Sequence, residues 1–199
     1  MELISQPWPE PQRLAILPGS FNPPTRAHME LARAALSIAD AVLFVLPRRF
    51  PHKEYEGATL EQRVEMLRIS LAGEPRFAIG VSDGGLFIEI ARECRALWPQ
   101  AELDFVCGRD AAERIAGWNY GESEAFPRHL EEFGLLVAPR AGEFCIPSAL
   151  VSRVRPLPFA PHDDISSTEV RRRVAAGDEW MDLVPESIQE LVASAYSAG

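Results

Sequence analysis

Short apolar runs alternate with amphipathic segments along most of this chain. The runs are residues 14–17, 41–47, 77–81, 103–107 and 135–138. Apolar residues at helical spacing predict helices that begin at Thr25, run from Thr59 to Leu71, and run from Phe87 to Trp98. Buried strands separated by helices favour a parallel sheet covered on both faces, with right-handed crossovers. We therefore expect a doubly wound, Rossmann-like α/β fold.

The two ends of the chain have a different character. Residues 167–176 predict a charged helix that Gly177 ends, and residues 185–195 carry Ile188, Leu191 and Val192 at helical spacing. These two helices form a predicted C-terminal helical part, residues 165–199. The proline-rich opening, residues 1–12, predicts a loose arm. At 199 residues and 47% hydrophobic content the chain suits one domain, residues 1–199.

Charge and cysteine usage exclude several classes of protein. A formal net charge of -9 argues against a nucleic-acid-binding protein, which needs a basic face. Cys94, Cys107 and Cys145 are isolated and odd in number, so they suggest small buried side chains in a reducing compartment. No apolar segment is long enough to cross a membrane, and the first residues lack the pattern of a signal peptide. We expect a cytoplasmic protein that does not bind membranes.

The turn between the first strand and the first helix is the strongest candidate site. Gly19 lets backbone approach a ligand closely, and the first N–H groups of the following helix are unpaired, so they can bind an anion. His28 lies one turn into that helix, and its imidazole can donate to phosphate oxygens. The Gly-Lys-Ser/Thr ending of a Walker P-loop is missing.

The segment Gly19-Ser-Phe-Asn-Pro-Pro-Thr-Arg-Ala-His28 resembles the T/HxGH signature of the nucleotidylyltransferase superfamily. Its form is most similar to that of nicotinate and nicotinamide mononucleotide adenylyltransferases. Ala27 replaces the usual glycine, and Thr25 stands where bacterial nicotinate mononucleotide enzymes usually carry histidine. The resemblance implies ATP contacts for Gly19, Ser20, Phe21, Thr25 and His28, and an acceptor contact for Asn22.

Residues 164–173 resemble the ISSTxxR motif of the same superfamily, which holds the phosphates of ATP. The resemblance implies ATP contacts for Ile165, Ser166, Ser167 and Arg171. A guanidinium next to a helix N-terminus suits phosphate, which it can bind through two hydrogen bonds. The alternative is an ordinary capping box on a surface helix, formed by Ser166 and Glu169.

Two further segments resemble parts of bacterial nicotinate mononucleotide adenylyltransferases. The ending Pro51-His52-Lys53 is similar to their substrate loop, which implies that His52 and Lys53 meet the acceptor. The alternative is a solvated basic loop.

The second segment, residues 108–118, implies ATP contacts for Gly108 and Asp110 and stacking of Trp118 on the pyridine ring. A carboxylate can accept two ribose hydroxyls, and an indole face suits a flat heterocycle. The alternatives are a helix cap at Asp110 and a core tryptophan at Trp118.

One departure concerns recognition of the acceptor. Residues 83–89 replace the Ser-Tyr-Thr stretch that usually follows the third strand in the bacterial enzymes. A threonine that would hydrogen-bond the pyridine carboxylate is therefore missing, and Leu86 and Phe87 can offer only their backbone N–H groups.

The resemblance implies an adenylyltransferase that uses ATP and a mononucleotide. The mononucleotide phosphate attacks the α-phosphorus of ATP, and pyrophosphate leaves. Catalysis then rests on positioning and charge stabilisation by His28, Lys53 and Arg171, with Mg²⁺ held mainly through the ATP phosphates rather than by protein ligands.

Two other functions stay open at this point. One is transfer to another phosphorylated acceptor, such as pantetheine phosphate, or a cytidylyl reaction. The other is a nucleotide-binding regulatory module without turnover. The sequence also leaves open whether the chain forms a homo-oligomer.

Overall fold

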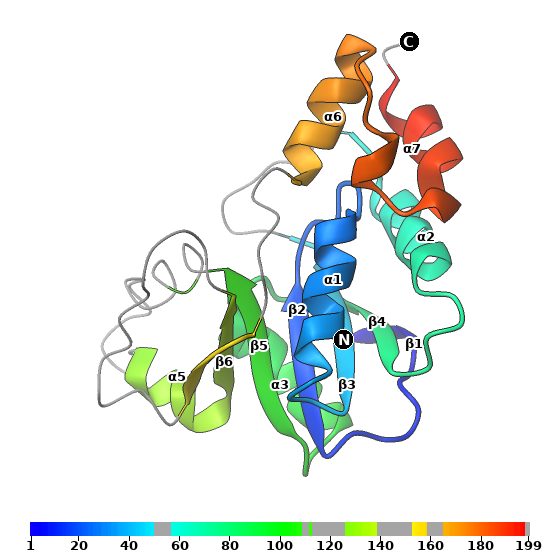
Figure 1. Cartoon of the computed structure of the whole chain (residues 1–199). Helices are drawn as coiled ribbons and strands as arrows, with labels where there is room; N and C mark the ends of the chain where they lie inside the picture. The colour runs from blue at the N-terminus through cyan, green and yellow to red at the C-terminus, as the bar shows by residue number, and fades with distance from the viewer. Residues whose placement is uncertain (50–56, 109–111, 113–125, 139–152, 159–164, 198–199) are drawn as a thin grey trace.

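The computed structural model describes residues 1–49, 57–108, 112, 126–138, 153–158 and 165–197 (Figure 1). Its strands are β1 (Glu2–Ser5), β2 (Arg13–Pro18), β3 (Ala41–Pro47), β4 (Phe77–Ser82), β5 (Glu102–Gly108), β6 (Gly134–Ala138) and β7 (Val154–Pro156). Its α-helices are α1 (Arg26–Ala35), α2 (Leu60–Ser70), α3 (Phe87–Leu97), α5 (Phe126–Glu132), α6 (Ser167–Ala176) and α7 (Gln189–Tyr196). Short 3₁₀ turns, η3 (Met181–Leu183) and η4 (Glu186–Ile188), lie between α6 and α7. The strands and helices expected from the apolar pattern are confirmed with shifts of one or two residues at their ends, except that the last helix, expected from residue 185, becomes α-helical only at Gln189.

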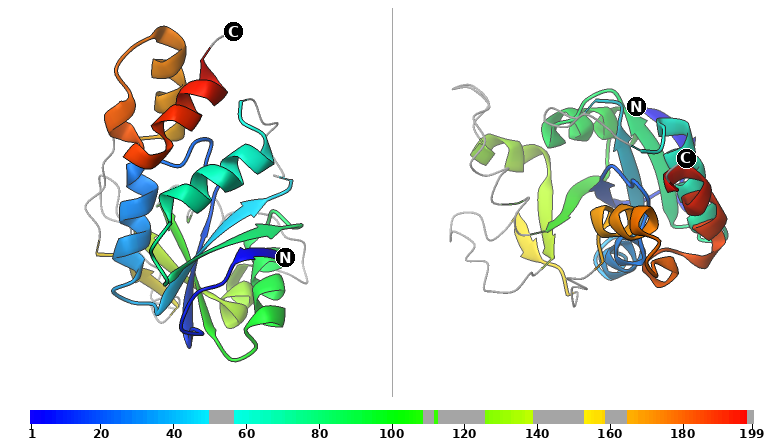
Figure 2. Two further views of the ribbon diagram at one scale, coloured as in Figure 1. Left: turned by 90° about the vertical axis from the view of Figure 1, so that its right-hand side faces the viewer. Right: turned by 90° about the horizontal axis from the view of Figure 1, so that it is seen from above.

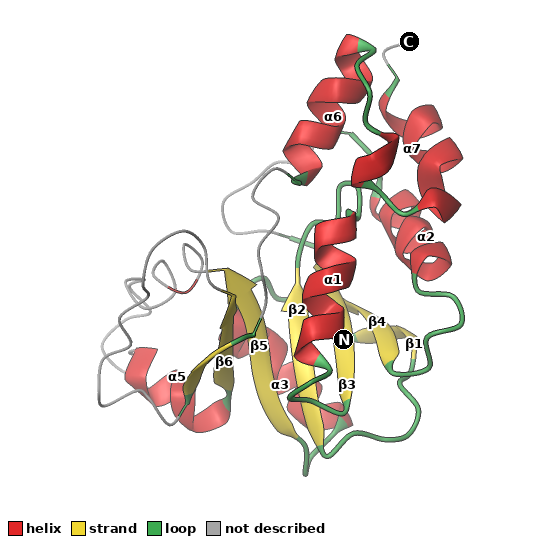
Figure 3. Cartoon of the chain, in the orientation of Figure 1, coloured by secondary structure: helices red, strands yellow, loops and turns green. Residues whose placement is uncertain are grey.

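The described strands form one sheet in the order β1-β4-β3-β2-β5-β6-β7 (Figure 3). β2 pairs in parallel with β3 on one side and with β5 on the other, so the strand order reverses between β2 and β5. In doubly wound sheets ligands bind beyond the carboxyl ends of the strands at such a reversal. The turn after β2 and Gly108 at the end of β5 lie at this edge.

Helices cover both faces of the sheet (Figure 2). On one face α1 and α2 pack through Met29, Ala32 and Leu67 onto β2, β3 and β4. On the other face α3 and α5 pack through Ile88 and Leu130. Successive strand residues point to opposite faces, so a strand buried on both sides must be apolar throughout, as all seven residues of β3 are. Continuous apolar runs therefore predicted the strands better than an alternating pattern would.

The expected loose arm at residues 1–12 is wrong for Glu2–Ser5. These residues form β1, which pairs antiparallel with β4 at the edge of the sheet. An edge strand needs only one partner, and β1 alternates exposed and half-buried residues instead of forming an apolar run. The strand β7 was not predicted either, because it has only three residues, which pair with β6.

The C-terminal helical part packs against α2 rather than against the sheet. Val170 of α6 and Val192 of α7 meet Met66 of α2 in an apolar cluster that also holds Trp180 and Ile188. Figure 1 shows α6 and α7 stacked beyond the end of α1 at which the turn from β2 enters. This cluster places the second predicted ATP motif, at the start of α6, beyond the end of α1 where the first predicted motif lies.

Two sequence expectations about individual residues are met. Gly177 ends α6 in the left-handed region at φ 73°. Cys94 and Cys107 are buried free thiols, and burial raises the pKa of each to about 12. Cys145 lies outside the described residues. Within the ranges that the structure describes, no helix is both long and apolar enough to cross a lipid bilayer.

Candidate active site

The turn from β2 into α1 is buried, although its residues form neither strand nor helix. Phe21, Asn22 and Thr25 each expose 4% or less of their surface. Phe21 adopts φ 46°, which is rare for a residue with a side chain, and its ring lies under Gly19. A Cβ added at Gly19 would lie 2.9 Å from that ring. Glycine is thus needed at position 19 for packing within the turn as well as for close approach of a ligand.

His28 is fixed in the turn by contacts to its ring. Its Nδ1 accepts the backbone N–H of Thr25 at 3.0 Å and lies 2.8 Å from the Thr25 hydroxyl. Phe21 packs against the ring edge to face at a centroid distance of 5.1 Å. Burial lowers the pKa of His28 to about 4, so the imidazole is neutral at pH 7. Because Nδ1 accepts a hydrogen bond, the proton lies on Nε2, which can donate to an anion.

The two predicted ATP motifs are in direct contact. Ser167 donates its hydroxyl to the carbonyl of Pro23 at 2.7 Å, and Arg171 Nη1 donates to the carbonyl of Asn22 at 2.6 Å. More than 140 residues separate these partners in the sequence. The N-terminal end of α6 is therefore held against the turn that starts α1, and both helices begin at the same place (Figure 1).

The hydroxyls of the second motif are used within the protein. Ser166 is the N-cap of α6, and its Oγ accepts the backbone N–H of Glu169 at 3.1 Å, which is one of the two hydrogen bonds of the capping box that the alternative predicted. Glu169 itself turns to Arg172 and Arg173, which together lower its pKa to about 2. Arg172 thus pairs at the surface, whereas Arg171 points to the turn. Ile165, half-exposed, precedes the cap and packs against the C-terminal apolar cluster.

Arg63 is a residue of this site that the sequence analysis missed. It lies in the first turn of α2 with 3% of its surface exposed, and its Nη1 donates to the carbonyl of Ser20 at 2.8 Å. Its Nε bonds the carbonyl of Thr59, which caps the same helix. A usable signal was present, because Arg63 stands on the buried stripe of α2, three and four residues before Met66 and Leu67.

The segment that replaces the Ser-Tyr-Thr stretch is held by acidic side chains. Glu89 accepts the backbone N–H groups of Gly85 and Leu86, both at 2.9 Å. Glu93 accepts the N–H of Gly84 and the hydroxyl of Ser82. The backbone N–H of Leu86, one of the two donors that the sequence analysis considered for the acceptor, is thus bonded to the first-turn glutamate of α3.

Four predicted site residues lie outside the described residues: His52, Lys53, Asp110 and Trp118. Their roles stay predictions. Gly108 is described at the end of β5, next to β2, and a Cβ there would meet none of the described residues within 4 Å.

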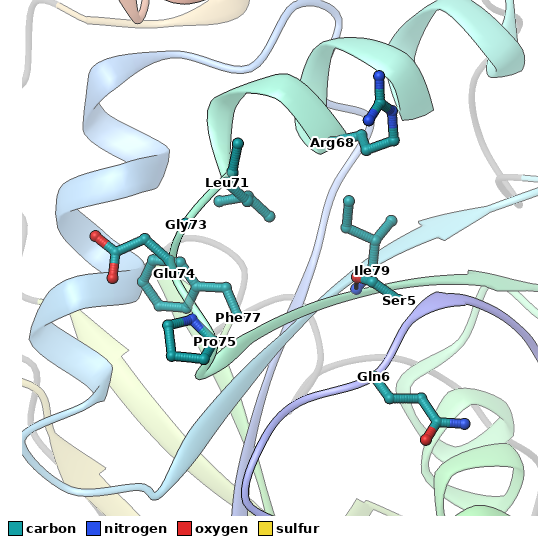
Figure 4. A pocket seen from close by; sticks show the side chains of 10 residues that line it. Ser5, Gln6, Arg68, Leu71, Gly73, Glu74, Pro75, Phe77 and Ile79 are labelled. Carbon is teal, nitrogen blue, oxygen red and sulfur yellow. Dashed lines mark hydrogen bonds between the residues drawn. The ribbon is translucent and has the colours of Figure 1, made fainter.

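A cavity of about 560 Å³ lies elsewhere, between the C-terminal end of α2 and the start of β4 (Figure 4). Leu71, Phe77 and Ile79 give it an apolar lining, with Arg68 and Glu74 at its rim. Phe77 is the first residue of β4, so this cavity lies toward the amino ends of the parallel strands. It is separate from the candidate active site.

Comparison with known proteins identifies the family. Residues 16–173 match the cytidylyltransferase-like family. Probable nicotinate-nucleotide adenylyltransferases from Gloeobacter violaceus and Thermus thermophilus are 33% and 34% identical, over 89% of this chain and 91% and 94% of their own lengths. The chain belongs to the nicotinate-nucleotide adenylyltransferase family. Both the resemblance of the motifs and the expected enzyme class are confirmed.

Solved structures of this family agree on the fold. Nicotinic acid mononucleotide adenylyltransferase from Plasmodium falciparum, complexed with NaAD, superimposes with a TM-score of 0.69 at 17% identity. The match covers 92% of this chain and 95% of that one. At this identity the likeness supports the Rossmann-like architecture, which is thereby confirmed for this nucleotidyltransferase.

Proposed function

We propose that this chain transfers AMP from ATP to nicotinate mononucleotide in NAD biosynthesis. An oxygen of the mononucleotide phosphate attacks the α-phosphorus of ATP, the bond from that phosphorus to the pyrophosphate oxygen breaks, and the dinucleotide forms. The observation that carries the proposal is the contact between the two phosphate motifs, through Ser167 to Pro23 and Arg171 to Asn22. A single polyphosphate can reach both helix N-termini, so both motifs can serve one ATP molecule.

In this proposal each described residue acts by position and charge. His28 donates from Nε2 to oxygens of the α-phosphate, where negative charge builds up, and its low pKa keeps it in the required neutral form at pH 7. Arg171 keeps one nitrogen on the turn and places its charge beside the phosphates. Arg63 holds the Ser20 carbonyl, which keeps the backbone of the turn in place. No protein nucleophile takes part in a direct displacement of this kind.

Magnesium enters the proposal as an ion carried by ATP. Among the described residues no cluster of three His, Cys, Asp or Glu side chains is arranged to hold a metal. Mg²⁺ prefers to keep several waters and to bind substrate phosphates, so an ATP-borne ion fits such surroundings. It would offset charge on the transferred phosphate, while the protein supplies orientation.

The test is pyrophosphate release by the purified protein with ATP, Mg²⁺ and a panel of acceptors. The panel contains nicotinate mononucleotide, nicotinamide mononucleotide and pantetheine phosphate. We expect turnover with the first, and a His28→Ala variant that still binds ATP but loses roughly 10²- to 10³-fold in kcat. Release only with pantetheine phosphate would indicate another acceptor, and ATP binding without any release would indicate a regulatory module.

A further inference from the structure

Tyr196, near the end of α7, reaches the turn that carries His28. Its hydroxyl donates to Asn22 Oδ1 at 2.6 Å, although 174 residues separate the two in the sequence. Asn22 exposes 4% of its surface, so this bond is shielded from water. The ring of Tyr196 packs on the apolar cluster that α6 and α7 form with α2. Packing in the cluster therefore fixes the position of the Tyr196 ring and, with it, the position of the hydroxyl.

Tyr196 also lies against the segment before α2. Its ring packs in the apolar cluster that holds Ala58, a residue with 3% of its surface exposed. Burial raises the pKa of Tyr196, so the phenol keeps its proton at neutral pH. Tyr196 thus contacts two stretches of chain that β3 separates, one through its hydroxyl and one through its ring.

Gly57 is the third residue of this contact region, which we call the junction of Tyr196, Asn22 and Gly57. It adopts φ 100°, and a Cβ there would lie 2.9 Å from the Tyr196 ring and 3.4 Å from Asn22 Oδ1. Gly57 directly follows the segment that contains His52 and Lys53, which the motif resemblance assigns to the acceptor. Tyr196 therefore contacts Asn22, the predicted acceptor residue of the turn, and Gly57, which follows the second predicted acceptor segment in the sequence.

We propose that Tyr196 is a positioning residue for acceptor binding, which holds the side chain of Asn22 in the Gly19–Thr25 turn and packs against Gly57. The inference rests on the proposed adenylyl transfer, in which Asn22 is assigned to the acceptor and His28 and Arg171 to ATP. Arg171 holds the backbone carbonyl of Asn22 rather than its side chain. Loss of the Tyr196 hydroxyl should therefore loosen the side chain of Asn22 and leave the ATP motifs in place.

Two variants test the junction, each with a matched control. Tyr196→Phe removes one buried hydroxyl, and Ser37→Ala removes a hydroxyl that bonds the carbonyl of Ala34, away from the turn. Gly57→Ala introduces both backbone strain and a clash. Gly73→Ala introduces similar strain at φ 85° with nothing within 4 Å of the new Cβ. An effect that Tyr196→Phe or Gly57→Ala shows and its control does not show is therefore assigned to the junction.

Kinetic constants are measured by pyrophosphate release at a temperature well below the Tm of every variant. Tyr196→Phe and Gly57→Ala should raise the KM for nicotinate mononucleotide roughly 2- to 10-fold, as expected for one lost hydrogen bond, with less than a roughly 2-fold change in the KM for ATP. The two controls should leave both KM values unchanged. A lower Tm with an unchanged acceptor KM would overturn the proposal, since Tyr196 would then have only a structural role. Equal increases in both KM values would also overturn it.

Amide hydrogen exchange provides a readout that does not depend on turnover. Tyr196→Phe should speed exchange in peptides covering Gly19–Thr25 and Gly57–Ala58, whereas Ser37→Ala should not. Unchanged exchange in both peptides would refute the junction. If Tyr196→Phe shows the exchange effect but the wild-type protein gives no turnover with nicotinate mononucleotide, the proposed reaction fails and the junction stands.

Discussion

His28→Gln isolates the contribution of the half-buried imidazole from that of the rest of the turn. Nδ1 of His28 accepts the N–H of Thr25, which precedes the helix by one residue. Glutamine at the third helical position accepts the same N–H in an ordinary capping box, so the variant keeps the start of α1. Both proteins should fold, and a comparison of their stabilities then reports the titration of His28 alone.

The size of the effect follows from the pKa of the folded protein. Burial lowers the pKa of His28 from 6.5 to about 4. Between these values the unfolded chain binds a proton that the folded chain does not bind. The stability linked to the neutral imidazole is therefore present above pH 6.5 and is lost as the pH falls toward 4. At about 1.4 kcal/mol for each pKa unit, wild type should lose up to about 3 kcal/mol relative to His28→Gln between pH 7 and pH 4.

Urea unfolding at closely spaced pH values measures this difference. Carboxylates and the other histidines titrate in both proteins, so subtraction of the two free energies of unfolding removes their contribution. A difference that does not change with pH would show that the folded protein leaves His28 with an ordinary pKa. A difference that favours wild type at low pH would show that the folded state holds the imidazolium. Either result would refute the lowered pKa of His28.

Three further variants probe other parts of the site. Arg171→Ala should raise the KM for ATP about 10-fold or more in steady-state kinetics, because a charge-assisted contact is lost. Its control, Arg172→Ala, removes a surface pair with Glu169 and should change this KM less than about 2-fold. Similar KM values for the two variants would contradict the assigned helix face. In urea titrations, Arg63→Met should lower the free energy of unfolding by about 1 to 3 kcal/mol, because the Ser20 carbonyl loses a buried donor. Its control, Arg68→Met, removes an exposed pair with Glu65 and should lower the free energy of unfolding by less than about 1 kcal/mol. Trp118→Ala should raise the KM for the mononucleotide and leave that for ATP nearly unchanged; an unchanged acceptor KM would remove Trp118 from ring stacking.

We expect recognition of the acid form of the acceptor to use donors other than the backbone N–H of Leu86. The N–H of Leu86 is bound by Glu89, and Asp83 nearby is paired with Arg48 at 3.2 Å. A ratio of kcat/KM for nicotinate over nicotinamide mononucleotide well above one would show that the chain finds another donor for the carboxylate. A ratio near one would show that the acidic side chains of this segment remove the discrimination.

Local signals in the sequence were sufficient for most of the fold. Continuous apolar runs identified the central strands because both faces of a doubly covered sheet are buried. Thr59 and Gly177 marked a helix start and a helix end through their own backbone preferences. The edge strands β1 and β7 gave no such signal, since each is short and pairs on one side only.

The sequence by itself predicted a phosphate site at Gly19, His28 and Arg171, because that prediction rests on the residue types and their local spacing. Only the tertiary structure decided how these residues are held. The pairs Arg63 with Ser20, Arg171 with Asn22, and Tyr196 with Asn22 join residues more than 40 positions apart. Each depends on the packing of α2, α6 and α7 around one apolar cluster, and such packing is set by the sum of many weak contacts rather than by any local pattern.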